Sequence, residues 1–247
     1  MLPKINETAY TALTVPSTGK VFNFRPYLVA EEKVLLLAME AGDQVGILDA
    51  VKNTLVACCQ ETLKADSLAL FDFEYLFAQV RSQSVGQTTT INMRCTNEVD
   101  EVPCNAMTEV EVDVSSITID VDPKATVIEL TADHTINMRW PSYKDGVDLT
   151  ANEVARQEGT ETSQVDAMFA LISSCIVSVQ SQDAVYNFAD ESKEDVDAWL
   201  NALQAEQLKM LFDFINSVPK LSHPIEFKCG TCGHDQTMVL EGLSDFF

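Results

Sequence analysis

Residues 91–95 read INMRC, residues 104–112 read CNAMTEVEV, and residues 225–232 read IEFKCGTC. In each stretch apolar and polar residues alternate with the period of two that is typical of a half-buried strand. Together they predict two β-hairpins. The loop of the first hairpin runs from Cys95 to Cys104, and the loop of the second contains Cys229 and Cys232. Each hairpin therefore carries two thiols at its tip.

Four thiols on two hairpin tips can surround one metal ion, and Zn²⁺ takes four sulfur ligands in a tetrahedron at about 2.3 Å. The spacing of Cys229 and Cys232 is that of a zinc knuckle, and Gly230 and Gly233 permit the tight turn that aims both sulfurs inward. The other two cysteines are separated by eight residues, which is a less specific spacing. The sequence therefore predicts a structural zinc ion held by Cys95, Cys104, Cys229 and Cys232.

Two other interpretations of these cysteines stay open. The thiols can be packed without a ligand, or Cys229 and Cys232 can form a C-x-x-C redox pair. Redox motifs usually place the first sulfur at a helix N-terminus, which lowers its pKa, whereas alternating residues flank this motif. His234 is a substitute ligand if one cysteine falls out of reach of the ion.

The rest of the sequence points away from catalysis. Three histidines are too few and too scattered for a histidine-based triad, and neither of the glycine-rich phosphate-binding motifs is present. Cys58, Cys59 and Cys175 fall in apolar helical stripes, where cysteine usually behaves as a small core residue. We therefore expect a protein that is not an enzyme.

Helical periodicity dominates residues 28–86, where three helices are predicted, and returns after about residue 149. The first helix ends at Gly42, Asp43 caps the second, and the third covers about residues 71–84. Further helices are predicted within residues 163–180, 193–202 and 205–218, with Ser192 as a cap. Short strands are predicted at residues 21–24, 117–121, 126–130 and 135–140, and the final hairpin at 225–243.

These elements predict an α+β fold: an N-terminal helical bundle, an antiparallel β region with two cysteine-tipped hairpins that resembles a zinc ribbon, and an inserted helical segment. The domains expected are an N-terminal arm (1–27), the bundle (28–86), the β domain (87–148 with 219–247) and the helical insertion (149–218).

The formal charge of the chain is −22, from 16 Lys and Arg against 38 Asp and Glu. Such an excess of acids argues against general binding to nucleic acid or to an anionic membrane, because both need clustered basic residues. The first residues lack a secretion signal, and no apolar run is long enough to span a bilayer, so we expect a soluble, non-secreted protein.

The charge is concentrated in the second part of the chain. Residues 1–94 hold 8 basic and 10 acidic side chains, whereas residues 95–247 hold 8 and 28. One interpretation is a solvated sheet face that prevents edge-to-edge pairing. The other is a surface for a basic protein partner, in which Glu98, Asp100 and Glu101 take part.

Two further sites of contact are considered. The terminal Phe246 and Phe247 either pack on their own hairpin or insert into a partner's pocket. Arg25 lies just before the first helix, where we expect it to form an ion pair with a nearby acid such as Glu32 rather than to bind a partner.

A set of short motifs in the first 90 residues or so is shared with a known family. The motifs are VPS (15–17) with Gly19, FRPYLV (24–29), EEK (31–33) leading into LLLA (35–38), FD (71–72) with EYLF (74–77), and Arg81, Ser84, Val85 and Gly86. With them the chain resembles the baseplate proteins of T-even-type contractile-tailed phages, the family of baseplate hub subunits and hub assembly proteins. The later strands and cysteines look similar only loosely, so the zinc prediction depends on this sequence alone.

The resemblance implies a structural or assembly role in the tail baseplate, near the hub, without catalysis. Its partners would be other phage baseplate or tail proteins, and its location the virion tail baseplate or the host cytoplasm during assembly. Two alternatives stay open: a zinc-ribbon adaptor that binds basic proteins of nucleic-acid machinery, and a thiol oxidoreductase that uses Cys229 and Cys232.

Overall fold

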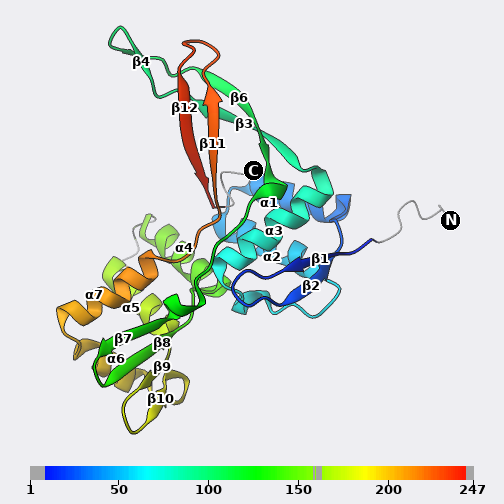
Figure 1. The fold of residues 1–247 in the computed structure, drawn as a ribbon. Helices are drawn as coiled ribbons and strands as arrows, with labels where there is room; N and C mark the ends of the chain where they lie inside the picture. The colour runs from blue at the N-terminus through cyan, green and yellow to red at the C-terminus, as the bar shows by residue number, and fades with distance from the viewer. Residues whose placement is uncertain (1–8, 158, 160–162, 243–247) are drawn as a thin grey trace, which may run out of the picture.

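The computed structural model describes residues 9–157, 159 and 163–242, and it confirms an α+β fold of helices and antiparallel strands (Figure 1). Three clusters of buried apolar side chains divide these elements into an N-terminal helical part, a pair of projecting hairpins, and a C-terminal part that contains a four-stranded sheet. The predicted Phe246 and Phe247 contacts lie outside the described residues.

The N-terminal part packs helices against a short hairpin. Strands β1 (Thr11–Thr14) and β2 (Val21–Phe24) pair antiparallel, and helices α1 (Val29–Ala41), α2 (Gln44–Cys58) and α3 (Leu70–Val85) follow. Asp43 caps α2 as predicted, because its side chain accepts a hydrogen bond from the backbone N–H of Val45 at 3.1 Å. The core of this part includes Phe24, Leu55, Phe73, Leu76 and Phe77.

Helix α1 lies further out than its sequence suggests. None of its 13 residues is buried, and the exposed fractions of Val34 and Met39 are 49% and 50%. Leu35 is the α1 side chain that packs against the N-terminal core. Apolar residues surround this helix on all sides, and α2 covers only one of them, so most of the apolar surface of α1 faces outward.

Two long hairpins project from the molecule side by side (Figure 1). The first pairs β3 (Thr88–Arg94) with β6 (Met107–Asp113), and between these strands a small hairpin pairs β4 (Glu98–Val99) with β5 (Val102–Pro103). The second pairs β11 (Ser222–Lys228) with β12 (Asp235–Glu241). Both of the predicted cysteine-bearing hairpins are therefore present.

The C-terminal part of the described chain combines one antiparallel sheet with four helices. Strands β7 (Val127–Thr131), β8 (His134–Met138), β9 (Ile176–Gln180) and β10 (Val185–Asn187) form an antiparallel sheet in the order β10-β9-β8-β7. Its helices are α4 (Tyr143–Gln157), α5 (Gln164–Cys175), α6 (Lys193–Asn201) and α7 (Ala205–Asn216). The indole of Trp140 stacks on Phe214 of α7 at 4.9 Å and meets Phe71 of α3 edge-on at 5.9 Å, so it joins α3 of the N-terminal part to α7 of the C-terminal part.

Two element predictions are wrong. The helix expected across residues 163–180 ends at Cys175, and β9 follows at once, because Ile176 and Val177 begin a β-branched run that pairs with β8. Residues 117–121 alternate like a strand but form none, and the buried Ile117 instead joins the core of the projecting hairpins. The segment 149–218 thus contributes two strands as well as helices, and the domain boundaries stay a prediction.

Candidate metal centre

The two projecting hairpins lie face to face and bring their tips together. Inward side chains of both hairpins form one apolar cluster, whose members include Met93, Val112, Ile225, Phe227 and Leu240. In each strand these residues alternate with exposed ones, so the pairing register keeps them all on one face. Cys95 directly follows β3 and Cys229 directly follows β11, so both arrive at the same end of this cluster.

The four predicted ligand residues meet there. The sulfur atoms of Cys95, Cys104, Cys229 and Cys232 all lie within 4.8 Å of one another, and all are free thiols. The sulfurs of Cys95 and Cys232 are 3.6 Å apart and those of Cys104 and Cys229 are 3.9 Å apart, so each close pair joins the two hairpins. Sulfurs at about 2.3 Å from a tetrahedral zinc ion stand about 3.8 Å from one another. The two close pairs match this separation, and all four sulfurs are near enough to one another to hold one metal ion.

A tight turn holds the Cys229–Cys232 half of the cluster. The backbone N–H of Cys229 donates to the carbonyl of His234 at 2.9 Å, and that of Gly233 donates back to the carbonyl of Cys229 at 2.9 Å. Gly233 has a φ of 71°, a left-handed conformation that favours glycine. The side chain of His234 is exposed and lies outside the group of four thiols.

Polar side chains around the thiols were not expected from the sequence. The amide nitrogen of Gln236 donates to the sulfur of Cys95 at 2.8 Å, while its oxygen accepts from the backbone N–H and hydroxyl of Thr96, both at 3.1 Å. The amide of Asn97 reaches the sulfur of Cys232 at 3.7 Å. Such donors stabilise thiolates and orient metal ligands. In a strand pattern these residues look like ordinary solvent-facing positions, so nothing in the sequence distinguishes them.

The thiols differ in acidity. Backbone N–H groups of Cys232 and Thr231 point at the sulfur of Cys229 and lower its pKa to about 6. At Cys104 the backbone N–H of Ala106 favours the thiolate, but burial and the neighbouring sulfurs outweigh it and raise the pKa to about 11. The cluster can thus supply one thiolate near neutral pH, and a bound cation would favour ionisation of the others.

The acidic loop beyond the cysteines forms the outermost tip of the hairpin pair (Figure 1). Glu98, Asp100 and Glu101 are all exposed there. Asp100 and Glu101 adopt φ values of 51° and 64°, which reverse the chain between β4 and β5. Val99 and Val102 on the same small hairpin are 46% and 65% exposed. The tip therefore presents apolar side chains together with carboxylates.

Of the remaining cysteines, Cys58 ends α2 and Cys175 ends α5, as predicted, whereas Cys59 directly follows α2 in an extended conformation. Cys58 and Cys175 are fully buried, Cys59 is half-buried, and burial raises the pKa of each thiol to about 11. They therefore stay protonated at neutral pH.

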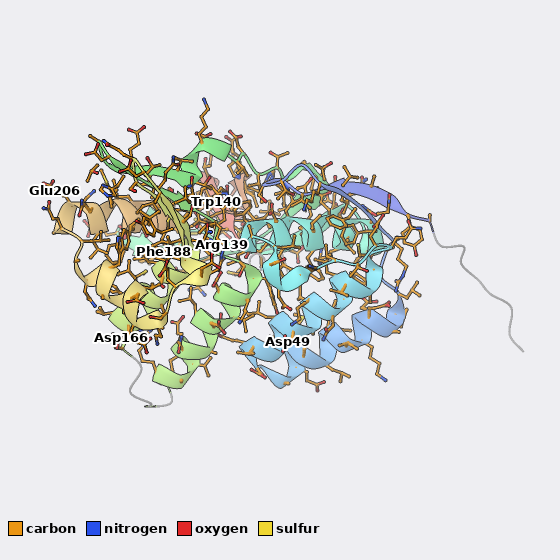
Figure 2. All side chains as sticks on the ribbon, turned by 90° about the horizontal axis from the view of Figure 1, so that it is seen from below. Asp49, Arg139, Trp140, Asp166, Phe188 and Glu206 are labelled. Carbon is orange, nitrogen blue, oxygen red and sulfur yellow. The ribbon has the colours of Figure 1, made fainter. Side chains whose placement is uncertain are left out.

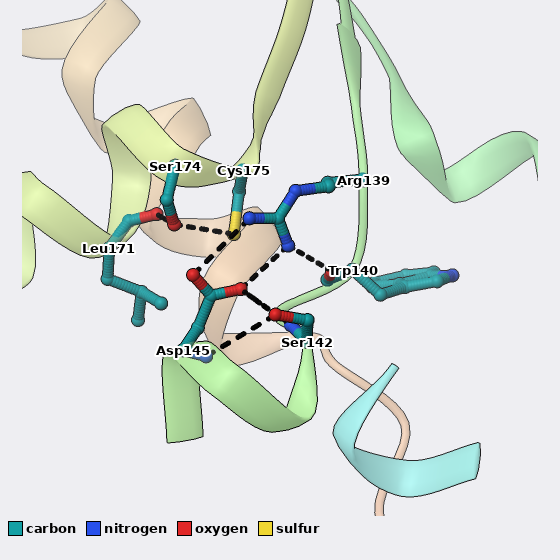
Figure 3. A network of polar contacts seen from close by, with 7 residues as sticks. All are labelled: Arg139, Trp140, Ser142, Asp145, Leu171, Ser174 and Cys175. Carbon is teal, nitrogen blue, oxygen red and sulfur yellow. Dashed lines mark hydrogen bonds and ion pairs between the residues drawn. The ribbon is translucent and has the colours of Figure 1, made fainter. Parts of the chain in front are cut away.

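Two partly buried polar networks connect neighbouring elements of the fold. Arg139 pairs with Asp145 at 2.7 Å, and the same carboxylate accepts from the backbone N–H and the hydroxyl of Ser142 at 2.7 and 2.6 Å (Figure 3). In the N-terminal part, the backbone N–H of Ser17 donates to the buried Asp72 at 2.9 Å, and the Ser17 hydroxyl donates to the same carboxylate. The first network joins the residue after β8 to the first turn of α4, and the second joins the turn between β1 and β2 to the first turn of α3.

Arg25 has a different partner from the one predicted. Its guanidinium pairs with Glu31 at 2.7 Å, not with Glu32, and also donates to the carbonyl of Ala57 at 3.2 Å. Glu31 is preferred because its other oxygen accepts from the backbone N–H of Leu28, which fixes the carboxylate at the start of α1. The prediction that Arg25 forms an ion pair with a nearby acid is thus confirmed, but the acid is Glu31 and not Glu32.

Taken together, fold and site define an α+β protein of helices and hairpins with a four-thiol cluster and an acidic tip. Its sequence matches the family model described as T4 bacteriophage base plate protein over residues 8–247. The chain belongs to this family, and the match extends well past the N-terminal motifs on which the resemblance was based. Searches of curated proteins and of solved structures found no match.

Membership of this family implies a structural protein of the phage tail baseplate, located in the virion tail and in contact with other tail or baseplate proteins. In the described part of the chain no helix is both long and apolar enough to cross a bilayer.

Proposed function

We propose that this chain is a structural or assembly protein of the baseplate hub region, and that it acts through protein surfaces without catalysis. The family match over residues 8–247 carries this proposal. It is supported by two partly buried polar networks that use their charged groups within the protein: Asp145 bonds to Arg139 and Ser142, and Asp72 bonds to Ser17. The protein works either in the virion tail baseplate or in the host cytoplasm during assembly.

Within this role the four-thiol cluster binds one structural Zn²⁺ ion. The sulfur spacings of 3.6 and 3.9 Å support zinc, and they join different hairpins, whereas a redox pair would join Cys229 to Cys232. The ion closes the outer end of the hairpin pair, where the apolar cluster ends. The chemistry it supplies is structural: it crosslinks segments that are 125 and 137 residues apart in the chain.

The metal is tested on protein purified without chelator. We expect about one zinc ion per chain by elemental analysis, and loss of that zinc in the Cys232→Ser variant. Cys59→Ser is the matched control, because Cys59 is a half-buried thiol outside the cluster. Protein that folds with no zinc, or equal zinc in both variants, would exclude this site.

The acidic tip contacts a basic baseplate partner through Glu98, Asp100 and Glu101, and the terminal Phe246 and Phe247 serve as apolar anchors in a partner. The exposure of the three acids and of Val99 and Val102 supports the first contact. For the second, deletion of both phenylalanines should reduce co-purification with baseplate proteins and lower phage yield.

The role itself is tested by deleting the gene and by mass spectrometry of purified virions and of baseplate intermediates. We expect that baseplates fail to form without the protein, and that the chain is found either in mature virions or only in the intermediates. Normal baseplates and normal phage yield in its absence would contradict the proposal.

A further inference from the structure

A pocket of about 400 Å³ opens in the C-terminal part, away from the thiol cluster. Its floor includes the buried side chains of Val179 on β9 and Val196 on α6. Phe188 and Trp199, both half-buried, line it further out and meet edge to face with ring centroids 5.4 Å apart. Figure 2 places Phe188 beside the C-terminal helices, at a distance from the N-terminal helical part. Roughly 300 to 1,000 Å³ is the usual size of a small-ligand pocket, and this one has the usual apolar interior.

The rim of the pocket is acidic. Glu191 and Asp195 line it, and both are exposed. One carboxylate oxygen of Asp195 accepts a hydrogen bond from the hydroxyl of Ser192 at 2.7 Å. No Lys or Arg is among the residues that line the pocket, and within the described part of the chain neither acid forms an ion pair with a basic side chain.

The surrounding chain adds to the negative potential. Residues 181–201 contain six acidic side chains and one basic side chain, Lys193, which is exposed and does not line the pocket. Tyr186 on the edge strand β10 is 52% exposed and adds a third aromatic ring to the lining. Three aromatic rings and two carboxylates that line one pocket form an environment that favours an organic cation over an anion or a neutral apolar group.

We infer that this pocket binds the guanidinium group of an arginine side chain carried by a partner protein. A planar guanidinium can stack on an aromatic ring while its N–H groups bond to two carboxylates, and it is more weakly hydrated than the ammonium group of lysine. Apolar walls at Val179 and Val196 suit the methylene stem of the same side chain. The inference rests on the proposed function, because the arginine would belong to a baseplate protein that binds this chain. It identifies the side chain that this acidic pocket recognises.

The full-length protein is tested with the peptide acetyl-Gly-Arg-Gly-amide as the probe. The chain has two tryptophans, Trp140 and Trp199, so the indole N–H signals of ¹⁵N-labelled protein are few and the Trp199→Phe variant assigns them. We expect a saturable shift of the Trp199 signal with millimolar affinity, and no shift of the buried Trp140. The peptide with citrulline in place of arginine has nearly the same shape without the charge, and should leave Trp199 unchanged.

Charge-neutral variants localise the binding. Glu191→Gln should weaken arginine-peptide binding by about two- to fivefold, the range of one exposed ion pair. Glu194→Gln is the matched control, because it removes the same charge from the first turn of α6 without touching the pocket. Asp195→Asn is a second test that keeps the side-chain shape near Ser192.

Three results would overturn the inference: no shift of Trp199 at tens of millimolar peptide, equal shifts with the citrulline peptide, or equal weakening by Glu191→Gln and Glu194→Gln. The proposed baseplate role is measured separately, by baseplate formation in the gene deletion. If the peptide does not bind but baseplates still fail to form without the protein, the pocket inference alone is wrong.

Discussion

Asp145 is held in its ionised form by the groups around it. Burial alone would raise the pKa of this carboxyl, but hydrogen bonds from Arg139 and from the hydroxyl and backbone N–H of Ser142 outweigh it and lower the pKa to about 2. A carboxyl whose pKa is lower in the folded than in the unfolded state stabilises the fold above its unfolded pKa. That stabilisation is lost as the pH falls from about 3.8 toward about 2.

Asp145→Asn should therefore destabilise the protein in a pH-dependent way. A shift from 3.8 to about 2 corresponds to roughly 2 kcal/mol at pH 7, and to about half of that at pH 3. Urea unfolding of wild type and variant at the two pH values measures the difference. Asp148→Asn on the same helix is the control, because Asp148 is exposed. An equal loss at both pH values would show that the ionised carboxylate is not the cause.

At the level of single residues, the contacts that could not be predicted from the sequence are those that depend on the three-dimensional fold. The meeting of the four cysteines could be predicted because each hairpin places two of them at its tip, where thiols commonly serve as metal ligands. Gln236 was not, since its role depends on the second hairpin lying within 2.8 Å of Cys95, and the pattern of one strand does not contain that distance. The same holds for Arg25, where only the three-dimensional start of α1 decides between Glu31 and Glu32.

Among the elements, α1 shows how an apolar helix can contribute little to the core. Leu37→Gln should change the free energy of unfolding by less than about 0.5 kcal/mol, because Leu37 is 54% exposed. Leu55→Ala, at a fully buried position on α2, should destabilise by about 2 to 5 kcal/mol. Chemical denaturation of both variants measures this contrast, and a large loss in Leu37→Gln would mean that α1 packs more tightly than its exposure indicates.

Periodicity located most elements, and it failed where a second principle competed with it. Apolar residues continue past Cys175 at helical spacing, yet β-branched Ile176 and Val177 enter the sheet because β8 offers a pairing edge. The stretch around Ile117 alternates correctly but finds no strand to pair with, so it packs as an irregular segment.

If the cysteine cluster binds zinc as proposed, the hairpin pair should depend on that ion more than the other elements do. A two-stranded hairpin is marginal by itself, and the buried cluster between these hairpins is the smallest of the three in the described chain. Removal of the metal by a chelator should therefore speed amide hydrogen exchange in residues 88–113 and 222–241, and leave residues 127–138 protected.

The Cys232→Ser variant supplies the control for this experiment. Its hairpins should exchange fast before the chelator is added and show no further change afterwards. Exchange that stays slow in chelated wild type would mean that apolar packing alone holds the hairpins together, and exchange that rises everywhere would mean that the three clusters unfold as one unit.

For the whole molecule, the acidic charge is unevenly divided along the chain. The first 94 residues carry nearly balanced charge and include the apolar α1, whereas the acidic excess belongs to the part that contains the hairpin tips and the aromatic pocket. The net charge of −22 thus comes almost entirely from the residues after position 94. The sequence predicted the division of charge, but only the fold brings Glu98, Asp100 and Glu101 to an outer tip.

This division predicts that partner association depends on where the acids lie and not on their number. The triple variant Glu98→Gln, Asp100→Asn, Glu101→Gln should bind its baseplate partner more slowly and with a weaker salt dependence than wild type, because rim charges act mainly on the association rate. The control triple variant Asp166→Asn, Glu194→Gln, Glu206→Gln removes the same charge from exposed first turns of three helices in the C-terminal part. Association is measured by surface binding to the isolated baseplate partner, with salt raised past about 0.1 M, where the screening length falls to about 10 Å. If both triple variants slow association equally, the net charge of the chain attracts the partner and the tip has no special part in docking.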